Sequence, residues 1–205
     1  MLRVLSRVEV AERMTSMDFF RNAPEDRKAE LIDGVMIMAP PPLYVHERLQ
    51  VFLLRLLSEY IETYQLGEVL GSRTAVVLAD DQTFEPDILF VSGERAGIIR
   101  AEGIFGAPDL VVEILSASTA SYDRGAKFRA YERAGVRELW LIDPYGPVGT
   151  EFFQMQGSIF HPVMPGENGV FTSSVLPGFK LYTNWLWPAE KFIPIQKALQ
   201  EMGRS

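Results

Sequence analysis

The sequence predicts a single mixed α/β domain of the α+β kind, with a β-hairpin near the N-terminus and further hairpins toward the C-terminus. Three observations support this class. Apolar residues recur at helical spacing between residues 43 and 64. Short apolar runs bounded by Pro, Gly and Asp, such as residues 86–92 and 108–116, are typical of strands. A second helical stretch, residues 120–134, is inserted before the last core strand.

The length and composition limit the class of protein. The chain has 205 residues, 47% apolar and 23% charged, which fits one globular domain over residues 1–205 and excludes wholesale disorder. The sequence has no cysteine, which removes disulfides and thiolate metal sites and favours a cytoplasmic protein. Residues 1–14 include Arg3, Arg7 and Glu9, so we expect neither a signal peptide nor a membrane anchor there.

Two small elements are predicted before the long helix. Thr15 is a favoured helix-capping residue and predicts a short helix that ends near Asn22. The apolar runs within residues 29–40 are joined by Asp33-Gly34, a dipeptide that favours the turn of a β-hairpin. A short helix and a hairpin therefore open the fold.

Residues 43–64 predict an amphipathic helix. Apolar side chains recur three or four residues apart, and charged side chains fill the opposite face. The apolar face consists of Leu49, Phe52, Leu53, Leu56, Leu57, Tyr60 and Ile61. We expect the helix to end at Gly67, because glycine commonly ends helices.

Strands and one helix make up the middle of the chain. The predicted strands lie within residues 68–80, 86–92, 108–116 and 137–144. The helix of residues 120–134 stops at Gly135. In the last third, turns at Gln156-Gly157 and at residues 167–169 predict hairpins, and the tail of residues 184–202 is expected to be helical in its last part.

The net charge of −7 argues against a nucleic-acid-binding protein, because such domains are usually basic. The charge is unevenly distributed. Residues 80–119 carry a charge of −6, and residues 120–137, directly after them, carry +3. Two readings are open: a random fluctuation over solvated faces, or a basic stretch where a phosphate could dock beside an acidic site.

Glu113 is out of place in its predicted strand. Side chains alternate between the two faces of a strand, and both faces of residues 109–116 are largely apolar, as in a central strand. An ionised carboxylate buried there needs a partner, because burying it alone costs several kcal/mol. Glu113 is therefore either half of a structural ion pair with an arginine or a metal ligand or catalytic acid.

Asp87 opens a second apolar strand and is the best partner for Glu113. Alone, an Asp at the start of a strand is a turn residue. Together, two carboxylates on neighbouring strands could converge on one Mg²⁺ or Mn²⁺. Asp109 competes for this role, but it lies four residues before Glu113 on the same strand, about 13 Å away, too far for one metal.

The helix of residues 120–134 carries the candidate cation. Arg124, Lys127 and Tyr131 are one turn apart, and we expect them to share one face. Lys127 is either a solvated helix lysine or a group that reaches the sheet and stabilises charge on a reacting phosphate. His46, near the start of the long helix, either faces the site or merely aids the helix N-terminus. The common phosphate-loop, dinucleotide-binding and zinc-protease motifs are absent from the sequence.

These residues carry a resemblance to a known family. Pro86-Asp87, then Glu113 and a later lysine, resemble the PD-(D/E)XK nuclease superfamily. More narrowly, AELIDG, PDILFVS, the block from Gly106 to Pro144 and LPGF are similar to the Uma-two family of restriction endonucleases. The resemblance covers roughly residues 12–190.

The resemblance implies a restriction-endonuclease-like core, a mixed four-stranded sheet between helices with a divalent metal, Mg²⁺ or Mn²⁺, at its middle. By position, Asp87, Glu113 and the backbone carbonyl of Ile114 would bind the metal. Glu30 of AELIDG matches the family's upstream acid, which would orient water or a second metal.

The sequence departs from the superfamily pattern at one position. Leu115 stands two residues after Glu113, where the superfamily has a lysine. The resemblance implies that the family supplies this lysine from the following helix, where Lys127 is the candidate.

The function implied is a divalent-metal-dependent endonuclease, a phosphodiesterase that acts on nucleic acid, with DNA the expected substrate, through attack of a metal-activated water on phosphorus. Asp87, Glu113, Lys127 and Glu30 would form the catalytic centre. A homodimer would suit cutting both strands, and no membrane partner is expected. The alternatives are an inactive nuclease-like scaffold that binds nucleic acid or a protein, and a hydrolase of small phosphate esters.

Overall fold

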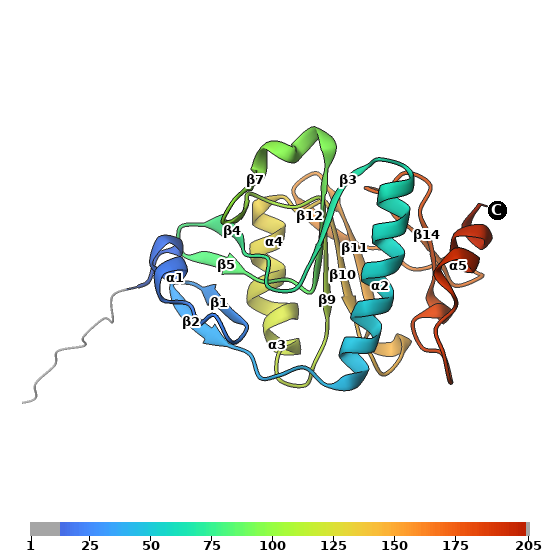
Figure 1. Ribbon diagram of the computed structural model, residues 1–205, viewed down its shortest axis with the longest axis horizontal. Helices are drawn as coiled ribbons and strands as arrows, with labels where there is room; N and C mark the ends of the chain where they lie inside the picture. Colours follow the sequence, from blue (N-terminus) through green and yellow to red (C-terminus); the bar gives the residue numbers. More distant parts are fainter. Residues whose placement is uncertain (1–12, 204–205) are drawn as a thin grey trace, which may run out of the picture.

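The computed structural model describes residues 13–203 as two mixed six-stranded sheets and a two-stranded ribbon, packed with helices (Figure 1). This confirms the mixed α/β class. Residues 1–14 were predicted to be neither a signal peptide nor a membrane anchor. Residues 1–12 of this stretch lie outside the described residues. Among the helices of residues 13–203, none is long and apolar enough to cross a membrane.

The central sheet has the strand order β12-β11-β10-β9-β6-β3. Its strands are β3 (Gly67–Gly71), β6 (Ile88–Ser92), β9 (Leu110–Ile114), β10 (Glu138–Ile142), β11 (Glu151–Gln156) and β12 (Ile159–Pro162). Only the pair β9–β10 is parallel within this sheet. The four-stranded sheet implied by the resemblance is too small, because the predicted hairpin of β11 and β12 adds two strands at one edge.

The helix between the parallel strands is present, but it is not regular. It consists of α3 (Ala120–Tyr122), a π-helical turn η2 (Asp123–Lys127) and α4 (Phe128–Ala134), and it ends at Gly135 with φ of 84°. Parallel neighbours need such a crossover. The π turn, which widens the helix by one residue, was not predicted, and it contains Lys127.

The second sheet has the order β2-β1-β5-β4-β8-β7 and contains the predicted N-terminal hairpin. Its strands are β1 (Ala29–Ile32), β2 (Val35–Met38), β4 (Val76–Ala79), β5 (Gln82–Phe84), β7 (Ile99–Arg100) and β8 (Gly103–Phe105). Asp33 and Gly34 both have positive φ, as the expected turn requires. Helix α1 (Ser16–Asn22) begins at Thr15 with a capping box, as predicted. The sequence analysis missed β5, β7 and β8, which have only two or three residues each.

Helix α2 (Tyr44–Thr63) covers one face of the central sheet, and α4 lies on the other side (Figure 1). On β9, Leu110, Val112 and Ile114 join the core cluster that includes the apolar face of α2. Val111 and Leu115 join the cluster on the side of α4. The alternation expected for this strand is confirmed, and Glu113 shares the face of α4.

Two turns differ from the sequence prediction, one in the C-terminal region and one after α2. The turn at residues 167–169 does not join a hairpin, because β13 (Val170–Thr172) pairs with β14 (Lys180–Tyr182) instead of with β12. Helix α2 ends before Gly67: Gln65 takes the left-handed conformation, with φ of 53°, and Gly67 lies in β3.

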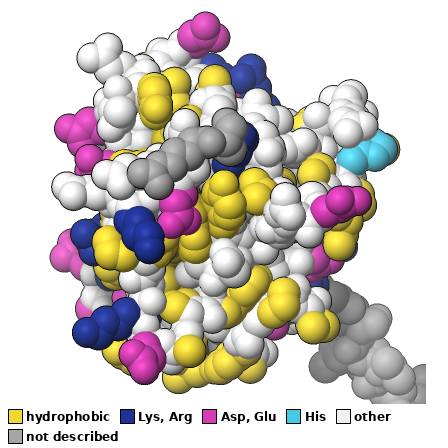
Figure 2. Space-filling model, turned by 90° about the vertical axis from the view of Figure 1, so that its right-hand side faces the viewer, with side chains coloured by type: hydrophobic (Ala, Val, Ile, Leu, Met, Phe, Trp, Pro, Cys, Tyr) yellow, Lys and Arg dark blue, Asp and Glu magenta, His cyan; other side chains and the backbone are white. Residues whose placement is uncertain are grey.

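The predicted tail helix is α5 (Ile195–Met202), and it packs against α2. On this side of the molecule, apolar side chains are interspersed with charged side chains of both signs (Figure 2). The surface here is therefore not uniformly basic, in keeping with the acidic composition.

Candidate active site

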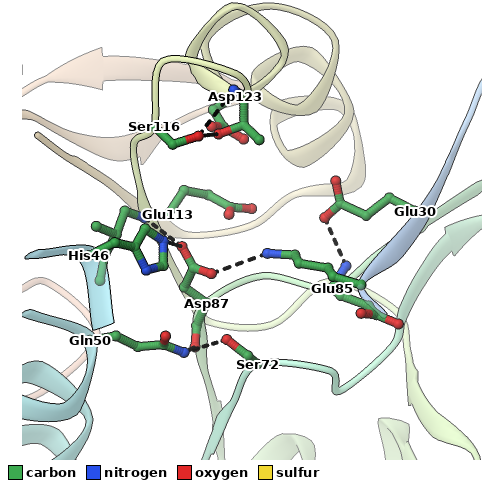
Figure 3. A network of polar contacts seen from close by, with 12 residues as sticks. Glu30, His46, Gln50, Ser72, Glu85, Asp87, Glu113, Ser116 and Asp123 are labelled. Atoms are coloured by element: carbon green, nitrogen blue, oxygen red, sulfur yellow. Dashed lines mark hydrogen bonds and ion pairs between the residues drawn. The ribbon is translucent and has the colours of Figure 1, made fainter. Parts of the chain in front are cut away.

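A pocket of about 610 Å³ opens between α2, the start of β1, the turn after β3 and the segment that follows β9. Glu30, Asp87 and Glu113 converge on this space from three different strands or strand ends (Figure 3). The other polar residues of the lining are Lys28, His46, Glu47, Gln50, Ser72, Arg73, Ser116, Ser118, Thr119, Asp123 and Lys127. The sequence candidates therefore meet in one cavity.

Asp87 directly precedes β6, and only 4% of its surface is exposed. Its Oδ1 lies 3.1 Å from Lys28 Nζ. Its Oδ2 accepts a hydrogen bond from the backbone N–H of Ile114 at 2.8 Å and lies 3.2 Å from His46 Nε2. Burial alone would raise the pKa of Asp87, but the Lys28 ammonium, His46 and the Ile114 N–H together lower this pKa well below its usual value. Asp87 is therefore a carboxylate at neutral pH.

Glu113 lies near the end of β9 and is 2% exposed. Its Oε1 accepts a hydrogen bond from the Tyr131 hydroxyl at 2.6 Å and lies 2.7 Å from Lys127 Nζ. Burial raises the pKa of Glu113 to about 7, with a further contribution from the negative charge of Asp123, although the charge of Lys127 opposes the shift. The need for a partner is confirmed; the partner is a lysine rather than an arginine.

Lys127 reaches the sheet from the π turn, and its side chain is 3% exposed. Its Nζ lies 2.7 Å from Glu113, 3.0 Å from Glu30 and 3.2 Å from Asp123. Burial would lower the pKa of Lys127, but these carboxylates raise it well above its usual value. Of the two readings, the solvated lysine is wrong.

Arg124 does not share the face of Lys127, which corrects the expectation. Its guanidinium lies at the surface, where Nε donates to Glu151 at 2.8 Å. A π turn rotates the residues before it relative to those after it, so the spacing of a regular helix does not hold across this turn. Tyr131, which follows the turn, does point toward the site, as its bond to Glu113 shows.

Glu30, on β1, is brought to the same place. Its Oε1 accepts hydrogen bonds from Lys127 Nζ at 3.0 Å and from the backbone N–H of Glu85 at 3.1 Å. Glu85 is itself 7% exposed, and within the described residues its Oε2 has no hydrogen-bond partner. Burial raises the pKa of Glu85, against the opposing charges of Arg73 and Lys28.

His46 faces the site, which decides between its two readings. Its side chain is 10% exposed, with Nε2 at 3.2 Å from Asp87 and Nδ1 at 3.4 Å from Glu47. Burial lowers the pKa of His46, but the hydrogen bond and charge of Asp87 more than offset this, so the pKa is raised. The imidazole therefore holds Asp87 in place.

The sequence analysis missed Lys28 and a polar bridge below Asp87. The side-chain amide of Gln50 donates to the Asp87 backbone carbonyl at 3.0 Å and also bonds to Ser72. A signal for Gln50 was present, because Gln50 lies one turn after His46 on α2 and both residues are buried. Two buried polar residues on consecutive turns of an otherwise apolar helix face indicate that this face borders a functional site.

Comparisons with known proteins identify the family of this chain. Residues 12–184 match the model of the Uma2 family, described as "Putative restriction endonuclease". The chain belongs to the Uma2 family. It is 28% identical over 140 residues to "Uncharacterized protein sll1609" of Synechocystis, an alignment that covers 67% of this chain and 79% of that protein.

The fold of this Uma2 protein is also similar to a crystal structure described as a "putative nuclease belonging to DUF820", from Anabaena variabilis. The TM-score is 0.64 and the identity 17%, over 92% of this chain and 99% of the other. At this identity the likeness shows the fold alone.

The structure of the Uma2 protein also places Asp109, which spacing excluded as a metal ligand, and the basic stretch after Glu113. Asp109 directly precedes β9, at the opposite end of this strand from Glu113, and is 1% exposed. It pairs with Arg95 at 3.0 Å and Arg137 at 2.9 Å and does not line the pocket. Within the basic stretch of residues 120–137, Arg129 and Arg133 are exposed, but the other three cations are enclosed or paired. Lys127 is buried, and Arg124 and Arg137 each have an acidic partner.

The donor set fits a divalent cation by its chemistry and charge. Within residues 13–203, no group of three or more His, Asp or Glu side chains is arranged as a ready metal cluster. However, acidic side chains outnumber lysines in this buried network. The acids are Glu30, Glu85, Asp87, Glu113 and Asp123, and the lysines are Lys28 and Lys127. The excess of hard oxygen ligands favours Mg²⁺ or Mn²⁺ over softer metals.

Proposed function

We propose that this Uma2 protein is a divalent-metal-dependent endonuclease with a restriction-endonuclease-like core, acting on nucleic acid, with DNA as its main substrate. One observation carries the proposal. A buried lysine, Lys127, bridges Glu30 and Glu113 at 3.0 and 2.7 Å in the pocket that also contains Asp87. Membership of the Uma2 family, described as putative restriction endonucleases, supports the same reaction class.

Asp87, Glu113 and the backbone carbonyl of Ile114 are the groups that would hold Mg²⁺ or Mn²⁺. All three residues line the pocket. When bound, such an ion lowers the pKa of a water and offsets negative charge on a phosphate. The excess of carboxylates over lysines in the network is the feature of this chain that fits such an ion.

The chain's own groups would orient the reactants. The Lys127 ammonium has three N–H donors, which face Glu30, Glu113 and Asp123, and its pKa is raised, so it stays charged and orients these carboxylates around the pocket. Glu30 and Asp123 hold this ammonium from either side. Tyr131 fixes Glu113. Such fixed donors act without reorganisation during the reaction, which is what stabilises developing charge.

The acidic composition limits affinity rather than chemistry. A chain with a net charge of −7 is expected to bind DNA weakly at physiological salt, because its overall charge repels the phosphate backbone. A homodimer would bring two pockets to one duplex.

The decisive experiment is nicking of supercoiled plasmid and cleavage of short DNA and RNA with Mg²⁺ or Mn²⁺. We compare the wild type with Asp87→Ala, Glu113→Ala and the surface control Glu167→Gln, whose residue lies outside the pocket. Loss of cleavage in Asp87→Ala and Glu113→Ala, but not in Glu167→Gln, would support the proposal. Equal cleavage by all four proteins would mean a contaminating nuclease and would contradict it.

The same proteins separate the alternatives. The inactive scaffold predicts no saturable binding of Mn²⁺ in calorimetry, with or without DNA. The hydrolase of small phosphate esters predicts turnover of a model diester without salt-sensitive DNA binding. Light scattering of the wild type, with and without a duplex, tests the homodimer.

A further inference from the structure

Lys28 is the second lysine of the centre, and it sits on the carboxylate that would bind the metal. It directly precedes β1, and its Nζ lies 3.1 Å from Oδ1 of Asp87. Its side chain is 25% exposed and lines the pocket. Lys127, in contrast, is 3% exposed. The two lysines of the site therefore differ in how tightly the protein encloses them.

The contacts of Asp87 leave one oxygen for a metal. Oδ2 is already held by the backbone N–H of Ile114 and by His46. Oδ1 has Lys28 as its partner. A divalent ion that binds Asp87 through Oδ1 must therefore approach the Lys28 ammonium, and two cations on one carboxylate oxygen repel each other.

The Lys28 ammonium occupies a site of strongly negative character. Burial lowers the pKa of Lys28, but the charge of Asp87, together with those of Glu113 and Glu30, raises it above its usual value. These are the carboxylates that surround the expected metal. The Lys28 ammonium thus offsets part of the negative charge of these carboxylates, as a bound cation would.

We propose that Lys28 is the resident counter-cation of Asp87, which a divalent metal must displace, and that the displaced ammonium then binds a phosphate of the substrate. The inference rests on the proposed function and adds a role for a residue outside the resemblance. Lys28 is the lysine able to move, because it has one carboxylate contact at 3.1 Å, whereas Lys127 has three. The lysine side chain is long and has many rotamers, so its head can turn toward the pocket.

The first test measures Mn²⁺ binding by calorimetry in the absence of nucleic acid. We compare the wild type with Lys28→Met, Lys28→Arg and the control Lys197→Met, a helix lysine that is 65% exposed. Loss of the competing charge should tighten Mn²⁺ binding about tenfold or more in Lys28→Met, while Lys28→Arg and Lys197→Met stay close to the wild type. Thermal melting of each variant checks its fold, and Lys28→Gln provides a second neutral variant.

The second test measures the salt dependence of binding to a short oligonucleotide, with Ca²⁺ in place of the catalytic ion. One lost phosphate contact lowers the slope of log affinity against log salt by about 1. Lys28→Met should show this loss only with Ca²⁺ present, because without it Lys28 stays on Asp87.

The outcomes distinguish the inference from the function on which it rests. If the wild type binds Mn²⁺ and Lys28→Met binds it equally or more weakly, the inference is wrong and the proposed metal centre stands. If no folded protein of the series binds Mn²⁺, the metal centre itself is wrong. An unchanged salt slope in both conditions overturns the phosphate-binding role.

Discussion

The hydroxyl of Tyr131, on the crossover helix, donates a 2.6 Å hydrogen bond to Glu113, on the central strand, and both residues are buried. The same Oε1 also lies 2.7 Å from Lys127. Two donors from consecutive turns of one helix therefore fix a single carboxylate oxygen. This fixes the direction in which Glu113 faces the pocket before any ligand binds.

Tyr131→Phe should weaken metal binding while the protein stays folded. The ring keeps its packing, for example against Phe84, and only the hydroxyl is lost. A buried hydrogen bond to a charged group contributes about 1.5–3 kcal/mol to the free energy of unfolding. Loss of an orienting partner typically lowers metal affinity or activity about 10–100-fold.

Mn²⁺ calorimetry and urea denaturation of Tyr131→Phe measure these two effects. Tyr145→Phe, at a tyrosine that is 72% exposed, is the matched control and should change neither. Metal affinity equal to that of the wild type would show that the hydrogen bond does not orient a ligand.

The free energy of unfolding of the metal-free wild type should depend on Glu113 in a specific pH range. The pKa of Glu113 in the folded protein is about 7, above its ordinary value of 4.5. The folded state therefore holds this proton more tightly than the unfolded state, and the stability contributed by Glu113 falls as the pH rises from about 4.5 to about 7. Above pH 7 the loss is complete.

Glu113→Gln removes this titration and tests its sign. The variant has a neutral amide beside Lys127 at every pH, so its own stability does not follow this titration. Its free energy of unfolding relative to the wild type should therefore rise between pH 4.5 and 7, by a few kcal/mol at most. Urea denaturation with a chelator, at pH 5 and pH 8, measures the difference, and parallel pH profiles for the two proteins would contradict the raised pKa.

Much of the fold and half of the site follow from the sequence alone. Asp87 and Glu113 were predicted because a carboxylate inside an apolar run is conspicuous. Lys28 was not, because it stands in the charged segment of residues 25–30, where a lysine looks solvent-exposed. Its partner is 59 residues away, and no local pattern encodes that contact.

The geometry of the crossover helix shows a second limit. The helix and its end at Gly135 were predicted from spacing. The π turn was not, because an inserted residue leaves no periodic signal in a stretch of this length. As a result, the expectation that Arg124 shares the face of Lys127 was wrong: Arg124 pairs with Glu151 at the surface.

Asp87→Asn should destabilise the protein most at neutral pH. Lys28 and His46 would then face a neutral amide in a buried site, and breaking such a pair costs about 3–5 kcal/mol. Because the pKa of Asp87 is lowered in the folded state, its contribution is complete above the ordinary pKa near 4 and is lost as the pH falls below it. Chemical denaturation from pH 3 to pH 7 should show the gap between wild type and variant closing at the acid end. A gap of constant size would contradict the lowered pKa.

Lys127→Met should lower the melting temperature more than Lys28→Met does. It leaves Glu30, Glu113 and Asp123 together without the ammonium that lies within 3.2 Å of all three. Like charges this close favour protonation, so the variant should gain stability as the pH is lowered from 8 to 5.

Added Mn²⁺ should restore part of the melting temperature of Lys127→Met at pH 8, because a divalent ion replaces the missing positive charge among the carboxylates. Thermal melts at both pH values, with chelator or with Mn²⁺, measure both effects, and Lys197→Met serves as the surface control. Lys127 is enclosed by carboxylates, whereas the side chain of Lys28 is 25% exposed. An equal fall in melting temperature in Lys127→Met and Lys28→Met would therefore contradict the different roles assigned to the two lysines.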